Sequence, residues 1–504
     1  MNANLFDILA RSITDAEAPA IETLDGARIN YADLVARTGR MANALVSLGV
    51  KPDDRVAVQA EKSVEAIILY LATARVGAVF LPLNTGYTAA EVAYFINDAE
   101  PSLFVCDPSR AADLTVAAEK AQARMVTLDA KGKGSLTDAA AAAPAGFDTV
   151  LRDKDDLAAL LYTSGTTGRS KGAMLTHGNL VSNALSLRET WHYTDKDVLI
   201  HALPIFHTHG LFVATNVTLF SGASMIFLPK FDIDRIFELM GRATVLMGVP
   251  TFYVRLLEDD MLNVETTANM RLFVSGSAPL LAETHREWRA RTGHAILERY
   301  GMTETNMNTS NPYDGERVAG TVGLPLPGTE VIVTDPETGA ELLQGEIGMI
   351  EVRGANVFKG YWRMPEKTDA ELRANGFFIT GDLGRIDDKG YVHIVGRGKD
   401  LIITGGYNVY PKEIEAEIDE IPGVLESAVI GIAHKDFGEA VTAVVVPTGT
   451  PGLTEAAIIA ALEGHLARFK QPKRVMFVTQ LPRNTMGKVQ KNLLREQYAE
   501  LYHK

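Results

Sequence analysis

The chain has 504 residues, of which 46% are hydrophobic and 22% charged, a composition that excludes an intrinsically disordered protein. Its net charge of −14 excludes a wholesale basic surface, so no nucleic-acid partner is expected. Its single cysteine, Cys106, allows neither an intramolecular disulfide nor a Cys-rich zinc site. This cysteine, and the lack of an apolar signal segment near the N-terminus, predict a cytoplasmic location.

The first 110 residues alternate helix and strand, which predicts an α/β fold with a mainly parallel sheet. Helices are predicted at 5–13, 31–49, 63–77 and 88–100, and strands at 55–60, 78–83 and 102–107. Asn30 and Ser63 are expected to cap two of these helices. The most apolar stretch, 66–83, is interrupted by Arg75 and Gly77, so no membrane span is expected. The Ala-rich residues 137–146 are interpreted as a tolerant surface connection.

The middle of the chain repeats the alternation of helix and strand, and the residue pattern changes after about residue 320. Strands at 157–162, 223–229 and 244–250 alternate with helices at 177–191 and 232–242. Short runs between 320 and 400, separated by Gly, Pro and Asp, predict a small antiparallel β region. Beyond it, a compact α+β unit is predicted with helices at 410–423 and 456–470, and the boundary at Lys399 divides the chain into residues 1–398 and 399–504.

The C-terminal tail is basic within an acidic protein. Residues 465–504 contain nine Lys or Arg and two acids. Such a run is usually a solvated surface, and the alternative is a face that handles anions.

The sequence YTSGTTGRSKG, residues 162–172, is the strongest local signal. It follows an apolar strand, and we expect a helix directly after it. Glycines and hydroxyls at this density allow backbone N–H groups to surround phosphate oxygens, and Lys171 adds a positive charge. The order of residues differs from that of a Walker A loop.

This segment resembles the phosphate loop of the adenylate-forming superfamily, which includes the acyl-CoA synthetases. Further matches follow in that family's order and cover nearly the whole chain: SGSAPL (275–280), RYGMTET (299–305), TGDLG (380–384), GRGKDLI (396–402) and PRNTMGKVQK (482–491). The resemblance implies a large N-terminal domain that binds ATP and the acid, and a small C-terminal lid that rotates between two half-reactions.

The resemblance also implies roles for single residues toward ATP and Mg²⁺. Asp382 is expected on the ribose hydroxyls, Arg397 on the ribose or α-phosphate, and Thr163 and Glu304 at Mg²⁺, with Thr303 beside them as a further catalytic residue. The other nucleotide-binding residues that it implies are Ser164, Gly165, Thr166, Thr167, Gly168 and Lys171 in the loop, and Ser277, Ala278, Pro279, Glu298, Arg299, Tyr300, Gly301 and Met302 near the adenine.

Lys488 matches the lysine of the family's C-terminal motif. The implied reaction joins a carboxylate to the α-phosphorus of ATP, so an ammonium between the two anions offsets their repulsion. An acyltransferase or deacylase that modifies Lys488 is a possible partner, because acylation would remove this charge.

Coenzyme A is the expected second substrate. Lys399 matches the hinge between the domains, and Gly405 and Gly406 resemble the backbone that lines the pantetheine channel. Lys470, Lys473 and Arg474 are candidates for the CoA phosphates.

The stretches expected to line the acyl pocket are polar or basic and resemble the malonyl-CoA synthetase branch of the superfamily. A second carboxylate must be paired when it is buried, and a guanidinium can pair with it through two hydrogen bonds. The resemblance points to Arg286 for this role, although an arginine in an Arg-rich helix could equally be solvated. The other expected pocket residues are His207, which is also a candidate catalytic gate, Thr208, Ser277, Met307 and Ser310.

These matches predict an ATP-dependent ligase that joins malonate, and methylmalonate as well, to CoA. The alternatives are a CoA ligase for another short, medium-chain or aryl acid, a stand-alone adenylation protein that loads a carrier protein, and an inactive adenylate-binding module.

Overall fold

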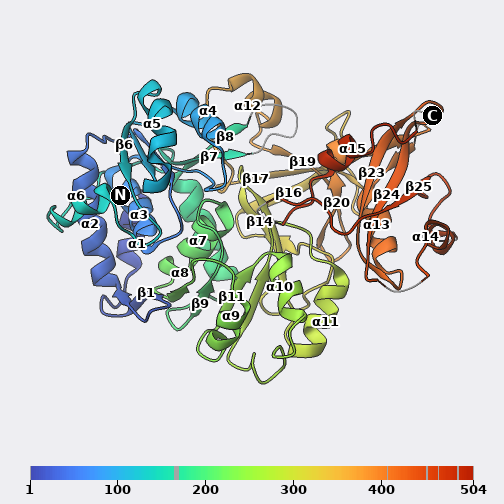
Figure 1. Cartoon of the computed structure of the whole chain (residues 1–504), viewed down its shortest axis with the longest axis horizontal. Coiled ribbons are helices and arrows are strands. Elements are labelled where there is room, and N and C mark those ends of the chain that lie inside the picture. Colours follow the sequence, from blue (N-terminus) through green and yellow to red (C-terminus); the bar gives the residue numbers. More distant parts are fainter. Residues whose placement is uncertain are drawn as a thin grey trace.

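The structure is a computed structural model, and it describes residues 2–163, 170–405, 407–449, 452–463, 465–484 and 487–502. Its described strands form four sheets, three in the large N-terminal part and one in the small C-terminal part. In Figure 1 the C-terminal part, drawn orange to red, lies at one end of the molecule, beside β20 and α11.

Two large sheets form the framework of the N-terminal part. The seven-stranded sheet is parallel except at β8 and β18, and its order is β18 (Gly360–Tyr361), β8 (Lys171–Thr176), β7 (Leu157–Thr163), β4 (Val79–Pro82), β3 (Arg55–Gln59), β5 (Leu103–Cys106) and β6 (Arg124–Thr127). The nine-stranded sheet has the order β15 (Leu324–Pro325), β14 (Asn306–Ser310), β13 (Leu297–Met302), β12 (Leu272–Ser275), β11 (Val245–Gly248), β9 (Val198–His201), β10 (Ser224–Phe227), β1 (Pro19–Thr23) and β2 (Arg28–Asn30). The six strands from β13 to β1 are parallel, and β2, β14 and β15 are antiparallel additions at the edges.

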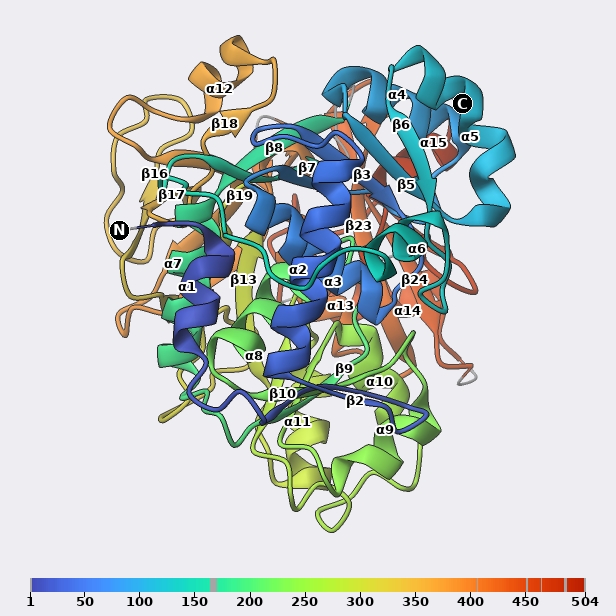
Figure 2. The ribbon, with the colours of Figure 1, turned by 90° about the vertical axis from the view of Figure 1, so that its left-hand side faces the viewer.

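Helices cover these sheets, and several lie in front of them in Figure 2. They are α1 (Leu5–Ser12), α2 (Tyr31–Ser47), α3 (Val64–Val76), α4 (Ala89–Ala99), η1 (Pro108–Arg110), α5 (Ala111–Lys120), α6 (Ser135–Ala141), α7 (His177–Thr190), the π-helix η2 (His209–Thr215), α8 (Asn216–Phe220), α9 (Ile233–Met240), α10 (Pro250–Leu257) and α11 (Ala282–Thr292). Nearly every residue of α3 is buried, because this apolar helix lies in the core shared by strands of both sheets. Its burial removes a large apolar area from water, which is the main force that holds the two sheets together.

A small antiparallel sheet and the C-terminal part complete the chain. The small sheet contains β16 (Thr329–Thr334), β17 (Gly348–Gly354), β19 (Phe378–Ile386) and β20 (Val392–Arg397), and α12 (Pro365–Glu371) lies near it. The turn η3 (Gly398–Asp400) leads into the last sheet. That sheet and its helices are β21 (Ile402–Thr404), β22 (Tyr407–Val409), α13 (Pro411–Asp419), β23 (Val424–His434), β24 (Gly438–Pro447), α14 (Glu455–Leu462), β25 (Arg474–Phe477) and α15 (Lys491–Gln497).

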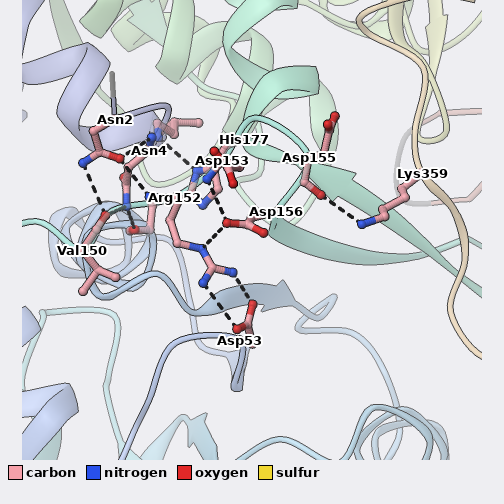
Figure 3. Close-up of polar contacts among 12 residues, drawn as sticks. Asn2, Asn4, Asp53, Val150, Arg152, Asp153, Asp155, Asp156, His177 and Lys359 are labelled. Carbon is pink, nitrogen blue, oxygen red and sulfur yellow. Dashed lines mark hydrogen bonds and ion pairs between the residues drawn. The ribbon is translucent and has the colours of Figure 1, made fainter.

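The N-terminal residues are anchored to the segment that precedes β7 (Figure 3). The Asn4 side chain donates to Val150 O at 3.1 Å, and the Arg152 backbone N–H donates to Asn2 Oδ1 at 2.9 Å. Arg152 also forms ion pairs with Asp53 and Asp156. These contacts tie α1 to the seven-stranded sheet without using any residue predicted at the functional site.

Most sequence-based expectations for the fold are confirmed. The Asn30 side chain accepts a hydrogen bond from Asp33 N and that of Ser63 from Ala66 N, so both predicted caps are present. The α/β class, the mainly parallel sheets and the antiparallel β region also agree with the structure. In the described part of the chain, no helix is both long and apolar enough to cross a membrane.

Two local expectations are wrong. The phosphate loop joins two antiparallel strands, because β8 pairs with β7 before α7 begins. The Ala-rich segment is mostly at the surface, as expected, and it also includes the end of α6 and carbonyls of Pro144 and Gly146 that accept from Asn43. Helix α14 ends at Leu462, eight residues earlier than predicted.

Candidate functional site

Residues that follow parallel strands of the nine-stranded sheet meet around one buried arginine. His207, Thr208 and the start of η2 come after β9, Ser277 comes after β12, and Arg299 lies on β13. Loops at the carboxyl ends of parallel strands gather at the same edge of a sheet, which is the usual place for a ligand. Thr208 Oγ1 and His209 Nε2 are buried and have no hydrogen-bond partner among the described residues.

Arg299 is the central charge of this site. Its side chain is 4% exposed, and Nε and Nη2 have no hydrogen-bond partner in the described ranges. Burial lowers the pKa of Arg299 to about 9, so the guanidinium is still a cation at neutral pH. A buried guanidinium without a carboxylate is expensive, and an anionic ligand at this position would satisfy it.

The neighbouring histidines are neutral. Burial, followed by the nearby charge of Arg299, lowers the pKa of His207 to about 4, and the same causes lower that of His209. His209 Nδ1 lies 3.2 Å from Ser277 Oγ, and the His209 backbone N–H donates to His207 Nδ1 at 3.2 Å. Positive charge at the site therefore comes from the arginine, and the imidazoles contribute shape and hydrogen bonds.

The backbone around Arg299 has an unusual conformation. Ser277 has a φ of 72° and Asn306 a φ of 50°, both in the left-handed region that non-glycine residues seldom adopt. A Cβ at Gly276 would lie 2.3 Å from Arg299 Cζ, and one at Gly301 would lie 2.5 Å from Met307 Cε. The two glycines thus leave space for the guanidinium and the methionine, and backbone strain of this kind is concentrated at functional sites.

A second cluster combines a carboxylate, a phenol and a guanidinium. Asp382 on β19 is buried, its Oδ1 lies 2.8 Å from Arg397 Nε, and its Oδ2 accepts from the Tyr300 hydroxyl. The cross-strand pair Asp382–Arg397 of β19 and β20 brings the two charges together. Each carboxylate oxygen keeps a lone pair for a hydroxyl donor, so the predicted ribose contact is chemically possible.

Glu304 lies at the end of a network of charged groups. Its carboxylate is 5% exposed, and Glu304 Oε1 lies 3.0 Å from Tyr361 Oη. Tyr361 Oη is also 2.6 Å from Glu371 Oε2 and 3.2 Å from Lys171 Nζ. Burial raises the pKa of Glu304. Tyr361 and Glu371 were not predicted from the sequence, and GYW at 360–362 gives no chemical signal of this role.

The structure leaves most of the phosphate loop undescribed. Ser164, Gly165, Thr166, Thr167 and Gly168 lie outside the described residues. Thr163 ends β7 opposite Lys171, and its Oγ1 lies 3.4 Å from Lys171 O. Lys171 Nζ is 3.3 Å from Glu371 Oε2, so the lysine that follows the loop points toward the region of Glu304.

At the predicted Mg²⁺ site, the protein would supply only part of the ion's coordination shell. Within the described ranges, no three His, Cys, Asp or Glu side chains gather to hold a metal. Mg²⁺ commonly uses one or two protein oxygens and completes its shell with phosphates and water. The buried Glu304 carboxylate and the Thr163 hydroxyl supply such oxygens, so the predicted pair fits the ion.

Lys488 comes to this site from the C-terminal part. Lys488 is exposed, yet the surrounding protein lowers its pKa to about 8, chiefly by desolvation and then through the charge of Arg397. Asp382 acts in the opposite direction, so Lys488 lies close to the Asp382–Arg397 cluster. The preceding Gly487 packs against α10, where an added Cβ would be 3.3 Å from Thr251 Cγ2.

The other residues predicted at the nucleotide differ in how deeply they are buried. Thr303 and Met302 are half-buried beside Glu304, Ala278 is half-buried, and Pro279 is exposed. The carboxylate of Glu298 accepts from Gly320 N at 3.2 Å, and burial raises its pKa to about 8. This side chain is bonded to a loop of the large domain, and its predicted role toward the nucleotide stays a prediction.

The residues predicted for CoA lie on the C-terminal sheet. Gly405 has a φ of 58° and its N–H donates to Phe437 O at 2.8 Å, while Lys473 Nζ lies 5.1 Å from the Phe437 ring centroid. Lys470 pairs with Glu413 and Arg474 with Glu455, so three predicted cations do not converge on one point. Gly406 lies outside the described residues, and Lys399 lies in η3 between two sheets.

Two residues predicted at the acid already have partners in the protein. Arg286 on α11 is exposed and its Nη2 pairs with Glu420 Oε1 at 2.8 Å, which does not favour its predicted role toward the acid. Helix α11 turns Trp288 toward the core and Arg286 outward. Ser310 Oγ donates to Asn311 O and accepts from Trp191 Nε1, so it has no hydrogen left to donate to a substrate. Met307 and Thr208 are buried, and their role toward the acid stays a prediction.

Comparison with known proteins is consistent with this geometry. The family described as AMP-binding enzyme matches residues 10–362, and its C-terminal domain matches residues 413–488. The chain therefore belongs to the AMP-binding enzyme family. It is 35% identical to a malonate–CoA ligase of Arabidopsis thaliana, over 88% of this chain and 78% of that protein. It is also 36% identical to a feruloyl-CoA synthase of an Amycolatopsis species, over 94% and 95% of the two chains.

A solved structure is much more similar. The crystal structure of ATP-bound MatB from Rhodopseudomonas palustris is 66% identical, covers 100% of both chains and superposes with a TM-score of 0.98. The apo form of the same MatB, at the same identity and coverage, gives 0.88. The arrangement of the two parts in this structure is therefore closer to that of the ATP-bound protein.

Proposed function

We propose that this chain is an AMP-forming malonate–CoA ligase that also accepts methylmalonate. The observation that carries the proposal is the buried Arg299 guanidinium, whose N–H groups lack partners among the described residues beside His207 and Ser277. We assign the second carboxylate of malonate to Arg299, which the sequence places at the nucleotide, in place of Arg286. The relationship to a malonate–CoA ligase and the 66% identity to MatB support the same acid.

The reaction proceeds in two displacements. A carboxylate oxygen of malonate attacks the α-phosphorus of ATP, the bond to the β-phosphate oxygen breaks, and pyrophosphate leaves. The CoA thiol then loses its proton and attacks the acyl carbon, and AMP leaves with the electrons of the acyl–oxygen bond. We assign Lys488 to the charge that builds up in the first displacement and Asp382 and Arg397 to the nucleotide.

Thr163 and Glu304 would hold Mg²⁺, which would offset the negative charge of the phosphates. We assign Lys171, the first residue of β8, to the phosphates. We propose Lys399 as the hinge between the domains. Gly405 and Lys473, which both contact Phe437, are proposed to line the path of CoA. A cytosolic location and a modifying enzyme that acts on Lys488 stay predictions, and the accessibility of Lys488 supports the second.

The feruloyl-CoA synthase relative makes an aryl acid the alternative substrate. An aryl acid would leave the Arg299 guanidinium unpaired, which disfavours it. Pyrophosphate release with malonate, methylmalonate, acetate, octanoate and benzoate tests the proposal, with free CoA as the only thiol. We expect release and CoA thioester formation with the two diacids. Activity restricted to benzoate or octanoate, or thioester formation only with a carrier protein, would overturn it.

A further inference from the structure

A buried lysine that the mechanism does not use connects the two large sheets. Lys62 lies in the bend between β3 and α3, is 9% exposed, and forms an ion pair with no carboxylate in the described part of the chain. Its Nζ lies 3.0 Å from His201 Nδ1 and 2.8 Å from His201 O, and 4.4 Å from the centroid of the Phe227 ring. These three contacts hold the Lys62 side chain in one place.

The histidine that Lys62 contacts has a defined tautomer. His201 is the last residue of β9, and its Nε2 lies 3.0 Å from Gly210 O and 3.1 Å from Thr215 Oγ1. A carbonyl oxygen can only accept, so Nε2 carries the hydrogen and Nδ1 accepts from Lys62. Burial lowers the pKa of His201 well below its usual value, which agrees with one hydrogen on the ring.

The Gly210 carbonyl is part of the π-helix η2. The wider turn of a π-helix displaces carbonyls from their usual partners, and Thr215 Oγ1 also donates to Gly210 O, at 2.9 Å. An added Cβ at Gly210 would lie 2.0 Å from Pro204 O, so this turn is pressed against the segment after β9. Gly210 directly follows His207, Thr208 and His209, which border the space beside Arg299.

We propose that Lys62 and His201 are positioning residues for the acid substrate: Lys62 fixes the His201 tautomer, His201 holds the Gly210 carbonyl, and the 207–209 turn is thereby kept in place against the bound acid. This inference rests on the proposed function. The Asp382–Arg397 cluster lies on β19 and β20, and in the described ranges neither of these residues contacts Lys62 or His201. His209 in the turn contacts Ser277, which is predicted at both the nucleotide and the acid. We therefore expect the network to affect the acid more than the nucleotide.

The test compares initial rates of pyrophosphate release for wild type, Lys62→Met, His201→Leu and His201→Gln, with the exposed Lys120→Met as a control. Met has nearly the length of Lys without its N–H groups, and Gln can still donate to the Gly210 carbonyl while Leu cannot. We expect KM for malonate to rise about tenfold or more in Lys62→Met and His201→Leu, with KM for ATP within about twofold. His201→Gln should stay within about threefold of wild type, and Lys62→Met combined with His201→Leu should be no worse than either alone.

Equal KM changes for malonate and ATP, or an unchanged KM for malonate in folded Lys62→Met, would overturn the inference. Circular dichroism and thermal unfolding establish the folded state. If Lys62→Met does not fold, the test uses His201→Leu and His201→Gln alone. The same KM for malonate in these two variants would then overturn the inference. If wild type uses a different acid, the proposed function fails separately, and the same KM comparison is made with that acid.

Discussion

Arg286 on α11 pairs with Glu420, the residue that follows α13, so a side chain of the large domain contacts the small one. Arg286 Nη2 lies 2.8 Å from Glu420 Oε1, and the two side chains are 57% and 60% exposed. The pair occurs in the domain arrangement that resembles ATP-bound MatB. It joins the domains at the surface, whereas the guanidinium of Arg299 is buried.

Replacing Arg286 should therefore have little effect on the use of the acid. An exposed ion pair contributes only about 0–1 kcal/mol, so we expect Arg286→Met to change KM for malonate less than about threefold. Arg299→Met removes one partner of a buried charge pair, a loss of about 3–5 kcal/mol, so kcat/KM for malonate should fall by at least about a hundredfold. Pyrophosphate release at saturating ATP measures both. A larger loss of malonate activity in Arg286→Met than in Arg299→Met would assign the second carboxylate of malonate to Arg286.

The substitution Gly276→Ala tests the position of the Arg299 guanidinium without replacing Arg299 itself. A Cβ at Gly276 would lie 2.3 Å from Arg299 Cζ and 2.4 Å from Nη1, so Gly276→Ala must displace the guanidinium. We expect a rise in KM for malonate in the direction of Arg299→Met, with KM for ATP nearly unchanged. Gly241→Ala is the matched control, since a Cβ there meets no atom within 4 Å. Identical acid kinetics in both glycine variants would contradict the placement of the guanidinium.

The sequence predicts the fold better than it predicts the direction of charged side chains. Asn30 and Ser63 cap helices as expected, because capping depends on neighbouring residues alone. The choice between Arg286 and Arg299 depends on which face of α11 and which edge of β13 the tertiary structure buries. Likewise, the bonds of Ser310 to Trp191 and Asn311 join residues whose contact no local pattern reveals. Local rules predict elements, and long-range packing selects the site residues.

The pH dependence of the first displacement should follow Lys488. Desolvation lowers its pKa to about 8, so the fraction of charged ammonium decreases as the pH rises through about 8. Because the charged form is required, kcat/KM for pyrophosphate release should decline above that pH with a slope of one proton. Lys488→Arg should keep some activity and lose this decline, and Lys488→Met should lose about a hundredfold or more.

Thioester formation from isolated malonyl adenylate provides the control for Lys488. We assign Lys488 to the first displacement alone, so the rate of thioester formation should not show the decline above pH 8 in the wild type. A decline of equal size in both half-reactions would mean that another group, such as the CoA thiol or an unfolding step, controls the pH profile.

Glu298 should make stability depend on pH. Burial raises its pKa from 4.5 to about 8, so the folded state keeps a proton that the unfolded state releases above about pH 4.5. Its stabilising contribution is complete below pH 4.5 and is lost as the pH rises through about 8. Between pH 6 and pH 9 this loss amounts to about 3 kcal/mol, an upper bound because relaxation of the protein around the charge reduces it.

Glu298→Gln keeps an acceptor for Gly320 N without the charge, so its thermal unfolding should change less between these two pH values. The exposed Glu287→Gln serves as the control and should behave as wild type. Parallel pH profiles for wild type and Glu298→Gln would show that Glu298 is already ionised in the folded protein.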